Sequence, residues 1–283
     1  MVIGNEKGGA GKSTIAIHLA TALLHSGAKV AVVDLDLRQK SLAHFFDHRR
    51  AWTESAGVVL PMPLELATPA YEPTDGADAL DPFLDEAQAL ADVVLIDTPG
   101  GDTALSRAAH GRADTIITPM NDSFVDFDLL GEVNPVTLDI VRPSIYAETV
   151  WESRKQRAMS RGKSIDWLVL RNRLAVTEAR NRKRLEERIL TLAKRVGFRL
   201  GPGLRDRVIY RELFPFGLTI ADLSPQVRPV PVALSHVAAR QELRALRQAV
   251  GLADIELAEA SYAGPPGQAG VLGGEAPILK QAS

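Results

Sequence analysis

The sequence predicts an α/β fold with a doubly wound, mostly parallel sheet. Short apolar runs bounded by turn residues alternate with helical patterns, which is typical of βαβ units. The run Val94-Leu95-Ile96 is continuously apolar, as expected of a strand buried on both faces. A glycine-rich segment separates the first apolar run from the first helical pattern. We therefore expect helices on both faces of the sheet and a ligand site at the carboxyl ends of its strands.

One helix and five strands can be placed in order from these patterns. The first helix is expected at Lys12–His25, because Gly27 follows as a C-terminal stop. Residues 61–82 are rich in proline and acidic side chains, so we expect a surface loop there. The expected strands are residues 2–4, 29–34, 92–97, 115–118 and 166–171. The first is short for the centre of a sheet, which leaves open whether the natural chain starts upstream.

Length and composition favour one globular domain. The chain has 283 residues, of which 46% are hydrophobic and 24% charged. We expect a single domain over residues 1–262 and a disordered tail, residues 263–283, made mostly of Gly, Pro and Ala. The absence of cysteine excludes disulfides and Cys-ligated iron–sulfur clusters. No signal peptide and no apolar run near the roughly 18 residues of a membrane span is found, so we expect a cytoplasmic protein.

The glycine-rich segment reads Lys7-Gly8-Gly9-Ala10-Gly11-Lys12-Ser13-Thr14. Its glycines let backbone N–H groups fold around phosphate oxygens, and the helix behind it adds a positive N-terminal end. Lys12 would reach the β- and γ-phosphates of ATP, and the Ser13 hydroxyl would bind Mg²⁺. Glu6 stands where the usual phosphate loop has a glycine. The residues predicted to contact the nucleotide here are Gly8, Gly9, Ala10, Gly11, Lys12, Ser13 and Thr14.

Two acidic segments at strand ends complete the predicted site. Asp97 ends an apolar strand and is followed by Thr98-Pro99-Gly100-Gly101. We expect Asp97 to hold Mg²⁺ through a water molecule, while the glycines let the loop approach the γ-phosphate. Asp34 and Asp36 follow the preceding strand. For Asp34 a structural role is an equal alternative to a catalytic one.

The pattern Lys-Gly-Gly-x-Gly-Lys-Ser/Thr at residues 7–13 resembles the deviant Walker A motif of the ParA/MinD superfamily. The resemblance implies a P-loop ATPase that uses ATP as a switch and dimerises face to face around two nucleotides. Lys7 would then reach the partner's phosphates, and Asp36 would position the attacking water. Asn172, which follows the strand at 166–171, would lie beside the adenine. The alternative for Asn172 is a loop asparagine that bonds backbone groups.

Further segments resemble the MipZ family of division-plane positioning ATPases. They are residues 4–7, 38–39, 120–128, 170–174 and 205–215, and the resemblance covers roughly residues 1–250. It implies that an ATP-bound homodimer binds double-stranded DNA without sequence preference, binds ParB and inhibits polymerisation of FtsZ. It also implies association with the nucleoid and the cell poles.

Other members of the superfamily supply the alternatives. A ParA-type chromosome or plasmid partitioning ATPase often carries an N-terminal DNA-binding module, for which the early phosphate loop leaves no room. A MinD-like membrane switch needs a basic amphipathic C-terminal helix, whereas this chain ends in a Gly/Pro-rich segment with one lysine, Lys280. We therefore expect no membrane partner. A metabolic ligase on the same fold would need a substrate pocket.

A basic helix is expected at residues 177–196, capped by Thr177 and stopped by Gly197. Residues 171–211 contain thirteen Lys or Arg against four Asp or Glu, although the net charge of the chain is only −2. The expected buried face consists of Leu185, Ile189, Leu192 and Val196. The predicted DNA-binding cations beside it are Arg180, Arg184, Arg188 and Arg195. They would contact phosphates and not bases; a solvated helix face is the alternative.

Overall fold

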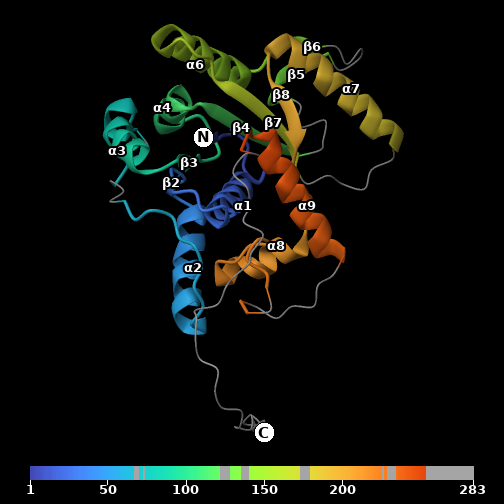
Figure 1. Cartoon of the computed structure of the whole chain (residues 1–283). Coiled ribbons are helices and arrows are strands. Elements are labelled where there is room, and N and C mark those ends of the chain that lie inside the picture. Colours follow the sequence, from blue (N-terminus) through green and yellow to red (C-terminus); the bar gives the residue numbers. More distant parts are fainter. Residues whose placement is uncertain are drawn as a thin grey trace, which may run out of the picture.

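The computed structural model describes residues 1–66, 70–72, 74–121, 128–134, 140–172, 179–224, 226–227 and 234–252. A six-stranded sheet lies at its centre, in the order β2-β3-β1-β4-β7-β8 (Figure 1). The strands are β1 (Val2–Ile3), β2 (Val30–Asp34), β3 (Val93–Asp97), β4 (Thr115–Asn121), β7 (Asp166–Asn172) and β8 (Arg199–Pro202). All five neighbouring pairs are parallel, which confirms the predicted fold class.

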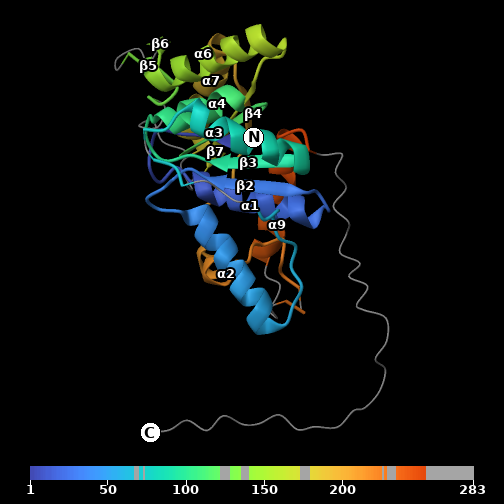
Figure 2. The same ribbon diagram turned by 90° about the vertical axis from the view of Figure 1, so that its left-hand side faces the viewer.

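Helices cover both faces of the sheet (Figure 2). One face packs against α1 (Lys12–His25), α2 (Ser41–Ala56), α8 (Val208–Leu213) and α9 (Leu234–Ala249). The opposite face packs against α3 (Ala77–Leu90), α4 (Ala104–Arg112), α6 (Ile145–Arg161) and α7 (Ala179–Val196). Successive strand residues point to opposite faces, so Val2 and Ile3 lie in different cores. The doubly wound arrangement is therefore confirmed.

The loop predicted for residues 61–82 is wrong at its end, because α3 begins at Ala77 and contains Pro82. The proline removes one helical hydrogen bond and costs ~3 kcal/mol in a helix interior. Burial of each large apolar side chain returns about 1.5–3 kcal/mol. The buried side chains of α3 are Leu80, Phe83, Leu84 and Ala87, spaced as one helix face. Their combined burial outweighs the proline.

Several elements have no individual counterpart in the expectations from sequence. They are α2, α4, α6, β8, α8, α9, the antiparallel pair β5 (Gly131–Val133) and β6 (Ile140–Pro143), and the 3₁₀ turn η1 (Phe214–Phe216). The predicted tail, residues 263–283, lies outside the described residues, as do residues 253–262 of the predicted domain. Among the described helices, none has both the length and the apolar character needed to cross a membrane.

The predicted basic helix is present as α7. It ends at Val196, and Gly197 follows with φ of 83°, the left-handed conformation of a helix stop. Ile189 and Leu192 are fully buried and Val196 nearly so, in agreement with the predicted apolar face. Thr177 lies outside the described residues, and so do the side chains of Leu185, Arg180, Arg184 and Arg188.

A buried ion pair fixes α2 against the segment that follows η1. The Arg49 guanidinium donates to Asp222 Oδ1 at 2.7 Å, and neither side chain is exposed. Arg49 also donates to the carbonyls of Pro61 and Gly217. His25, at the end of α1, lies 2.6 Å from the same Asp222 oxygen. Burial alone would raise the pKa of Asp222, but the bonds and charges of His25 and Arg49 hold it well below its usual range.

Candidate nucleotide-binding site

The glycine-rich segment connects β1 to α1 at the carboxyl edge of the sheet. Gly9 and Gly11 have φ of 75° and 90°, a region that glycine enters without steric cost. Helix α1 begins at Lys12, and its N-cap residue, Gly11, has no side chain that could bond the first N–H groups. These groups and the positive end of the helix dipole are therefore available to an anion. The loop has the geometry that the sequence predicts for a phosphate site.

Two buried asparagines hold this loop: Asn5, which precedes it and bonds to β4, and Asn172 at the end of β7. Asn5 Nδ2 donates to the carbonyl of Pro119 at 2.6 Å, and Asn5 Oδ1 accepts from Lys7 N at 2.7 Å. Asn172 Nδ2 donates to the carbonyl of Ala10 at 2.8 Å. A Cβ on Gly11 would lie 2.2 Å from that Nδ2 atom, so only glycine fits there. The loop is thus pre-shaped by bonds that reach across the sheet.

Asn172 bonds backbone groups with both ends of its amide. Its Oδ1 accepts from Leu204 N at 3.2 Å, while its Nδ2 holds the phosphate loop. Asn172 therefore does bond backbone groups, which is the alternative role considered from the sequence. Contact between Asn172 and the adenine stays a prediction.

Lys12 lies inside the loop with only 7% of its surface exposed. Its Nζ donates to the carbonyl of Lys7 at 3.1 Å. Burial lowers the pKa of Lys12, and the nearby carboxylates of Asp97 and Asp36 oppose that shift. The ammonium group therefore lies between the loop backbone and two carboxylates. Its positive charge would stabilise a phosphate chain bound there.

Asp97 is fully buried at the end of β3. Neither of its carboxylate oxygens has a hydrogen-bond partner of acceptable geometry among the described residues. Burial raises the pKa of Asp97 to about 7; the nearby Ser13 hydroxyl and Lys12 lower it, while Asp34 and Asp36 raise it further. Two unpartnered carboxylate oxygens beside a serine hydroxyl form an oxygen-donor set of the kind that Mg²⁺ binds together with nucleotide phosphates. The residues present therefore fit the predicted metal.

Asp34 and Asp36 have different surroundings. Asp34 Oδ2 accepts from the N–H groups of Leu42 and Ala43 at 2.9 and 3.1 Å, so Asp34 caps α2. Burial raises the pKa of Asp34, although these bonds oppose the shift. Asp36 Oδ1 accepts from the N–H groups of Arg38 and Gln39, which orients its carboxylate within the turn. The structure supports the structural role for Asp34 and leaves Asp36 as the predicted catalytic residue.

The loop after Asp97 packs directly on the phosphate loop. A Cβ on Gly100 would lie 3.2 Å from Gly8 N, and Gly101 has φ of 123°. Thr98 anchors the start of the loop, because its N–H and its hydroxyl both donate to the carbonyl of Ile3. These glycines therefore lie close to the phosphate loop, while their approach to the γ-phosphate stays a prediction.

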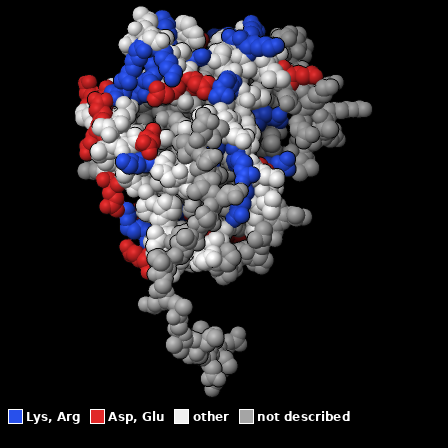
Figure 3. Space-filling view, viewed as in Figure 1, with Lys and Arg blue, Asp and Glu red and all other residues white. Residues whose placement is uncertain are grey.

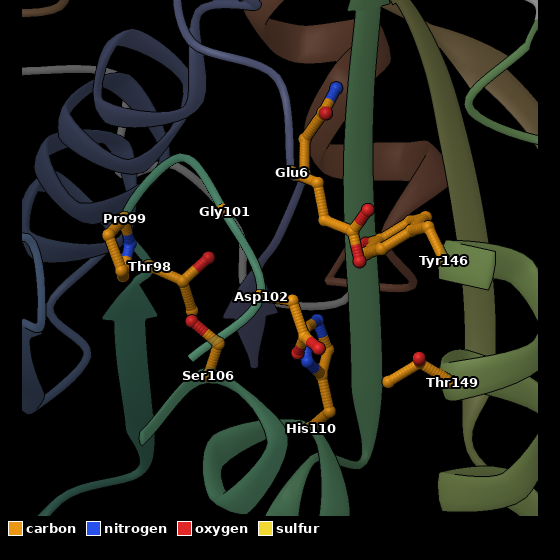
Figure 4. Close-up of a pocket in the computed structure, with 10 residues that line it drawn as sticks. Glu6, Thr98, Pro99, Gly101, Asp102, Ser106, His110, Tyr146 and Thr149 are labelled. Atoms are coloured by element: carbon orange, nitrogen blue, oxygen red, sulfur yellow. The ribbon is translucent and has the colours of Figure 1, made fainter. Parts of the chain in front are cut away.

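A small cavity of about 10 Å³, close to the room that one water needs, lies behind these loops (Figure 4). Glu6 and Asp102 enter it from the two loops, and burial together with Asp102 raises the pKa of Glu6. His110 of α4 is fully enclosed, and burial lowers its pKa to about 4. Tyr146 of α6 donates to the carbonyl of Gly4 at 2.8 Å.

Glycine is required at position 4, because a Cβ there would lie 2.4 Å from His110 Nε2. The polar chain continues from Tyr146 to Thr118 at 2.8 Å and from Trp167 Nε1 to Thr118 at 3.0 Å. Sequence reasoning missed this support beneath the loop, since its members are more than a hundred residues apart from Gly4 and share no local pattern.

The structure brings most of the predicted nucleotide residues together at one edge of the sheet. The predicted DNA-binding cations lie elsewhere, on α7, and of these only the Arg195 side chain is described; it is exposed.

Solved structures with similar folds include apo McdA of Cyanothece, with a TM-score of 0.57 at 18% identity over 88% of this chain and 98% of that one. MinD of Aquifex aeolicus gives a TM-score of 0.51 at 16% identity, over 88% and 96%. At such identities the likeness shows the fold, which is that of the ParA/MinD-type ATPases.

Curated relatives match shorter parts of the chain. An uncharacterised ATP-binding protein of Methanocaldococcus jannaschii is 28% identical over 146 residues, or 44% of this chain and 55% of that protein. An iron–sulfur cluster carrier protein of Deinococcus radiodurans is 39% identical over 51 residues, or 18% of this chain and 15% of that protein. The chain thus spans about half or less of the length of these relatives.

The family model of ATPase MipZ matches residues 1–254. That range contains the phosphate loop, both acidic strand ends, Asn172 and the whole of α7. The match therefore covers nearly all of the chain, including every element of the site described above, and the chain belongs to the MipZ family of ATPases.

Proposed function

We propose that this protein is an ATP-dependent dimerising switch that positions the cell-division plane. The observation that carries the ATPase part is the buried pair of Lys12 and Asp97 at the uncapped start of α1. Lys12 would neutralise the β- and γ-phosphates, and Asp97 with Ser13 would hold Mg²⁺. Bound Mg²⁺ would supply the charge that bridges these phosphates.

Family membership supports the partners in this proposal. The ATP-bound homodimer binds ParB and, without sequence preference, double-stranded DNA, and it inhibits polymerisation of FtsZ. The protein acts in the cytoplasm, at the nucleoid and the poles. Hydrolysis returns the dimer to monomers, so that ATP turnover sets the lifetime of the inhibitory state.

Two residues of the site have separate roles in the proposed cycle. Asp36 aligns the attacking water; its Oδ1 is fixed by two backbone N–H groups, which favours a positioning function. Lys7 stands five residues before Lys12, and its carbonyl is already bonded to Lys12 Nζ. Its side chain is proposed to neutralise the partner's nucleotide, as an arginine finger does.

Light scattering with and without ATP tests these roles through the oligomeric state. Lys7→Ala should bind ATP in an equilibrium titration yet remain monomeric, because the charge that crosses the interface is lost. Asp36→Ala should bind ATP and dimerise but not hydrolyse it, and should accumulate as a long-lived dimer. Lys29→Ala removes an exposed lysine before β2 and serves as the control, with wild-type behaviour. Normal dimerisation of Lys7→Ala would refute the role in trans.

A further inference from the structure

Helix α6 carries large apolar side chains that lie open on its surface. Trp151 is 53% exposed and Met159 is 79% exposed. Trp151, Lys155 and Met159 follow at four-residue spacing and so share one side of the helix. Lys155 Nζ lies 5.4 Å from the centre of the Trp151 ring. Tryptophan and methionine are enriched at protein contacts, so these two exposed side chains on α6 are typical of a docking surface.

A groove of about 310 Å³ lies beside these residues, between α6 and the end of α7. Trp151, Lys155 and Ala158 line it from α6, and Arg195 lines it from α7. Arg154, also in its wall, donates to the carbonyls of Ile165 and Gly197 at 3.1 and 2.6 Å.

The groove is basic. Arg154, Lys155 and Arg195 line it and no lining residue is acidic, although Lys155 Nζ also lies 3.7 Å from Glu152 on α6. Arg154 forms no ion pair with a described carboxylate, so its bonds to carbonyls leave its charge uncompensated. Figure 3 shows Lys and Arg side chains at the upper end of the molecule, over α6 and the end of α7. An acidic segment with apolar side chains would complement this groove.

A segment of that composition lies in this same chain. Residues 253–262 contain three acidic side chains and no basic one. Apolar and aromatic residues alternate with them: the order is Asp254, Ile255, Glu256, Leu257, Glu259 and Tyr262. The segment directly follows Leu252, which is the last described residue.

The chain leaves the described structure close to α6. Leu252 lines a surface groove together with Arg112 and Asp114. Arg157 of α6 donates to the carbonyl of Arg112 and pairs with Asp114. Six residues beyond Leu252 can span ~20 Å, whereas the path from Arg157 to Trp151 is about 9 Å along α6 and about a third of a turn around a helix ~10 Å across. Residue 258 can therefore reach the groove.

We propose that residues 253–262 dock in the groove between α6 and α7 of the same molecule. The acidic side chains lie against Lys155, Arg154 and Arg195, and the apolar ones cover Trp151 and Met159. Because the segment is tethered, its effective concentration at the groove is on the order of millimolar, so a weak contact is enough. This contact would cover cations next to α7. It does not depend on the function proposed above.

The absence of cysteine allows a direct test by crosslinking. The variant Ala158→Cys/Ala258→Cys places one thiol in the groove and one in the segment. The control Ala51→Cys/Ala258→Cys places the first thiol on α2, at an alanine that is also exposed. With a short bis-maleimide, the groove pair should crosslink at least ~10-fold faster than the control, at a rate independent of protein concentration. High salt should reduce that advantage, because it screens exposed charges.

Equal rates for the two pairs would overturn the proposal. A rate that rises with protein concentration and yields linked dimers would overturn it as well, since the segment would then come from a second copy. Tryptophan quenching by acrylamide gives a readout without cysteines. The variant Asp254→Asn/Glu256→Gln/Glu259→Gln should be quenched more strongly than wild type, and Trp151→Phe should remove the difference. The control Glu275→Gln should match wild type; an unchanged triple variant counts against docking by charge.

Discussion

At the scale of single residues, Asp97 bears the largest electrostatic cost in the site. Its carboxylate is buried without a described hydrogen-bond partner, and burial raises its pKa from 3.8 to about 7. Between these pH values the unfolded chain binds fewer protons at this group than the folded chain does. The contribution of Asp97 to stability is therefore present below pH 4 and is lost as the pH rises towards 7. Bound Mg²⁺ and nucleotide would restore the lost stability, because they favour the ionised form of Asp97.

Asp97→Asn should stabilise the protein in the absence of nucleotide and Mg²⁺. The gain in free energy of unfolding should approach ~4 kcal/mol above pH 7 and fade towards pH 4, because it follows the shift in pKa. Urea unfolding at pH 5, 6, 7 and 8 measures it. Asp34→Ala is a contrasting control: it loses the cap of α2 and should destabilise by about 1–2 kcal/mol. A gain in Asp97→Asn that does not change with pH would contradict the explanation.

The sequence predicts best those residues whose position along the chain already fixes their place in space. Lys12 and Ser13 start a helix behind a glycine loop, and Asp97 ends an apolar strand. The role of Asp34 could not be decided, because its partners are the N–H groups of a helix entered through Lys40 in a left-handed conformation. No sequence pattern marks that turn.

At the scale of elements, the pair of Arg49 and Asp222 joins α2 to the segment that follows η1. Thr219 donates to the second Asp222 oxygen through both its N–H and its hydroxyl. A Cβ on Gly217 would lie 2.0 Å from Arg49 N, which shows how closely the two segments approach. The network therefore fixes the position of α2, whose N-terminal end carries the Asp34 cap.

Asp222→Asn should destabilise the protein by roughly 3–5 kcal/mol, because it leaves the Arg49 charge buried and unpaired. Wild-type stability from this group is present above the ordinary pKa of aspartate and is lost only as the pH falls well below it. The difference between wild type and variant should therefore be constant from pH 8 to 9. Urea unfolding checks this, with Asp47→Asn as a control at an exposed ion pair of α2. Full stability in Asp222→Asn would argue against the network.

Elements were predictable where apolar patterns are long and were missed where tertiary packing decides. α1 begins and ends at the residues predicted. The start of α3 was predicted as loop because the segment up to Pro82 is rich in proline and acidic residues, although its apolar spacing indicates a helix. β8 has only four residues and alternates weakly, so its pairing with β7 outweighs any local signal.

At the scale of the whole molecule, ATP-dependent dimerisation would double the DNA-binding surface. One subunit offers about four cations on α7, which predicts weak binding near 10⁻⁴ M at physiological salt. Two subunits joined by ATP make the second contact intramolecular, with an avidity gain on the order of 10²-fold. DNA affinity should therefore need ATP, although no nucleotide atom touches DNA.

The slope of log affinity against log salt should roughly double on dimerisation. Arg184→Glu/Arg188→Glu should abolish DNA retention in a filter-binding assay without changing ATP turnover measured without DNA. Random and genomic duplexes should bind alike, and Lys29→Glu should behave as wild type. Equal DNA affinity of the ADP-bound monomer and the ATP-bound dimer would contradict this hypothesis and favour the alternative, that α7 presents an ordinary solvated face.

The shortness of β1 has a consequence for how the protein opens. This strand has two residues, yet the carbonyl of Met1 accepts from Ile96 N, that of Ile3 from Thr98 N, and Gly4 N donates to Ile117. Only residues 4–6 thus separate the middle of the sheet from the phosphate loop. Amide hydrogens at its base can exchange with solvent only when the central strands separate, which is the opening with the highest free energy. Breathing motions on the path to nucleotide release are therefore expected in the peripheral loops, while the start of the phosphate loop exchanges as slowly as the core.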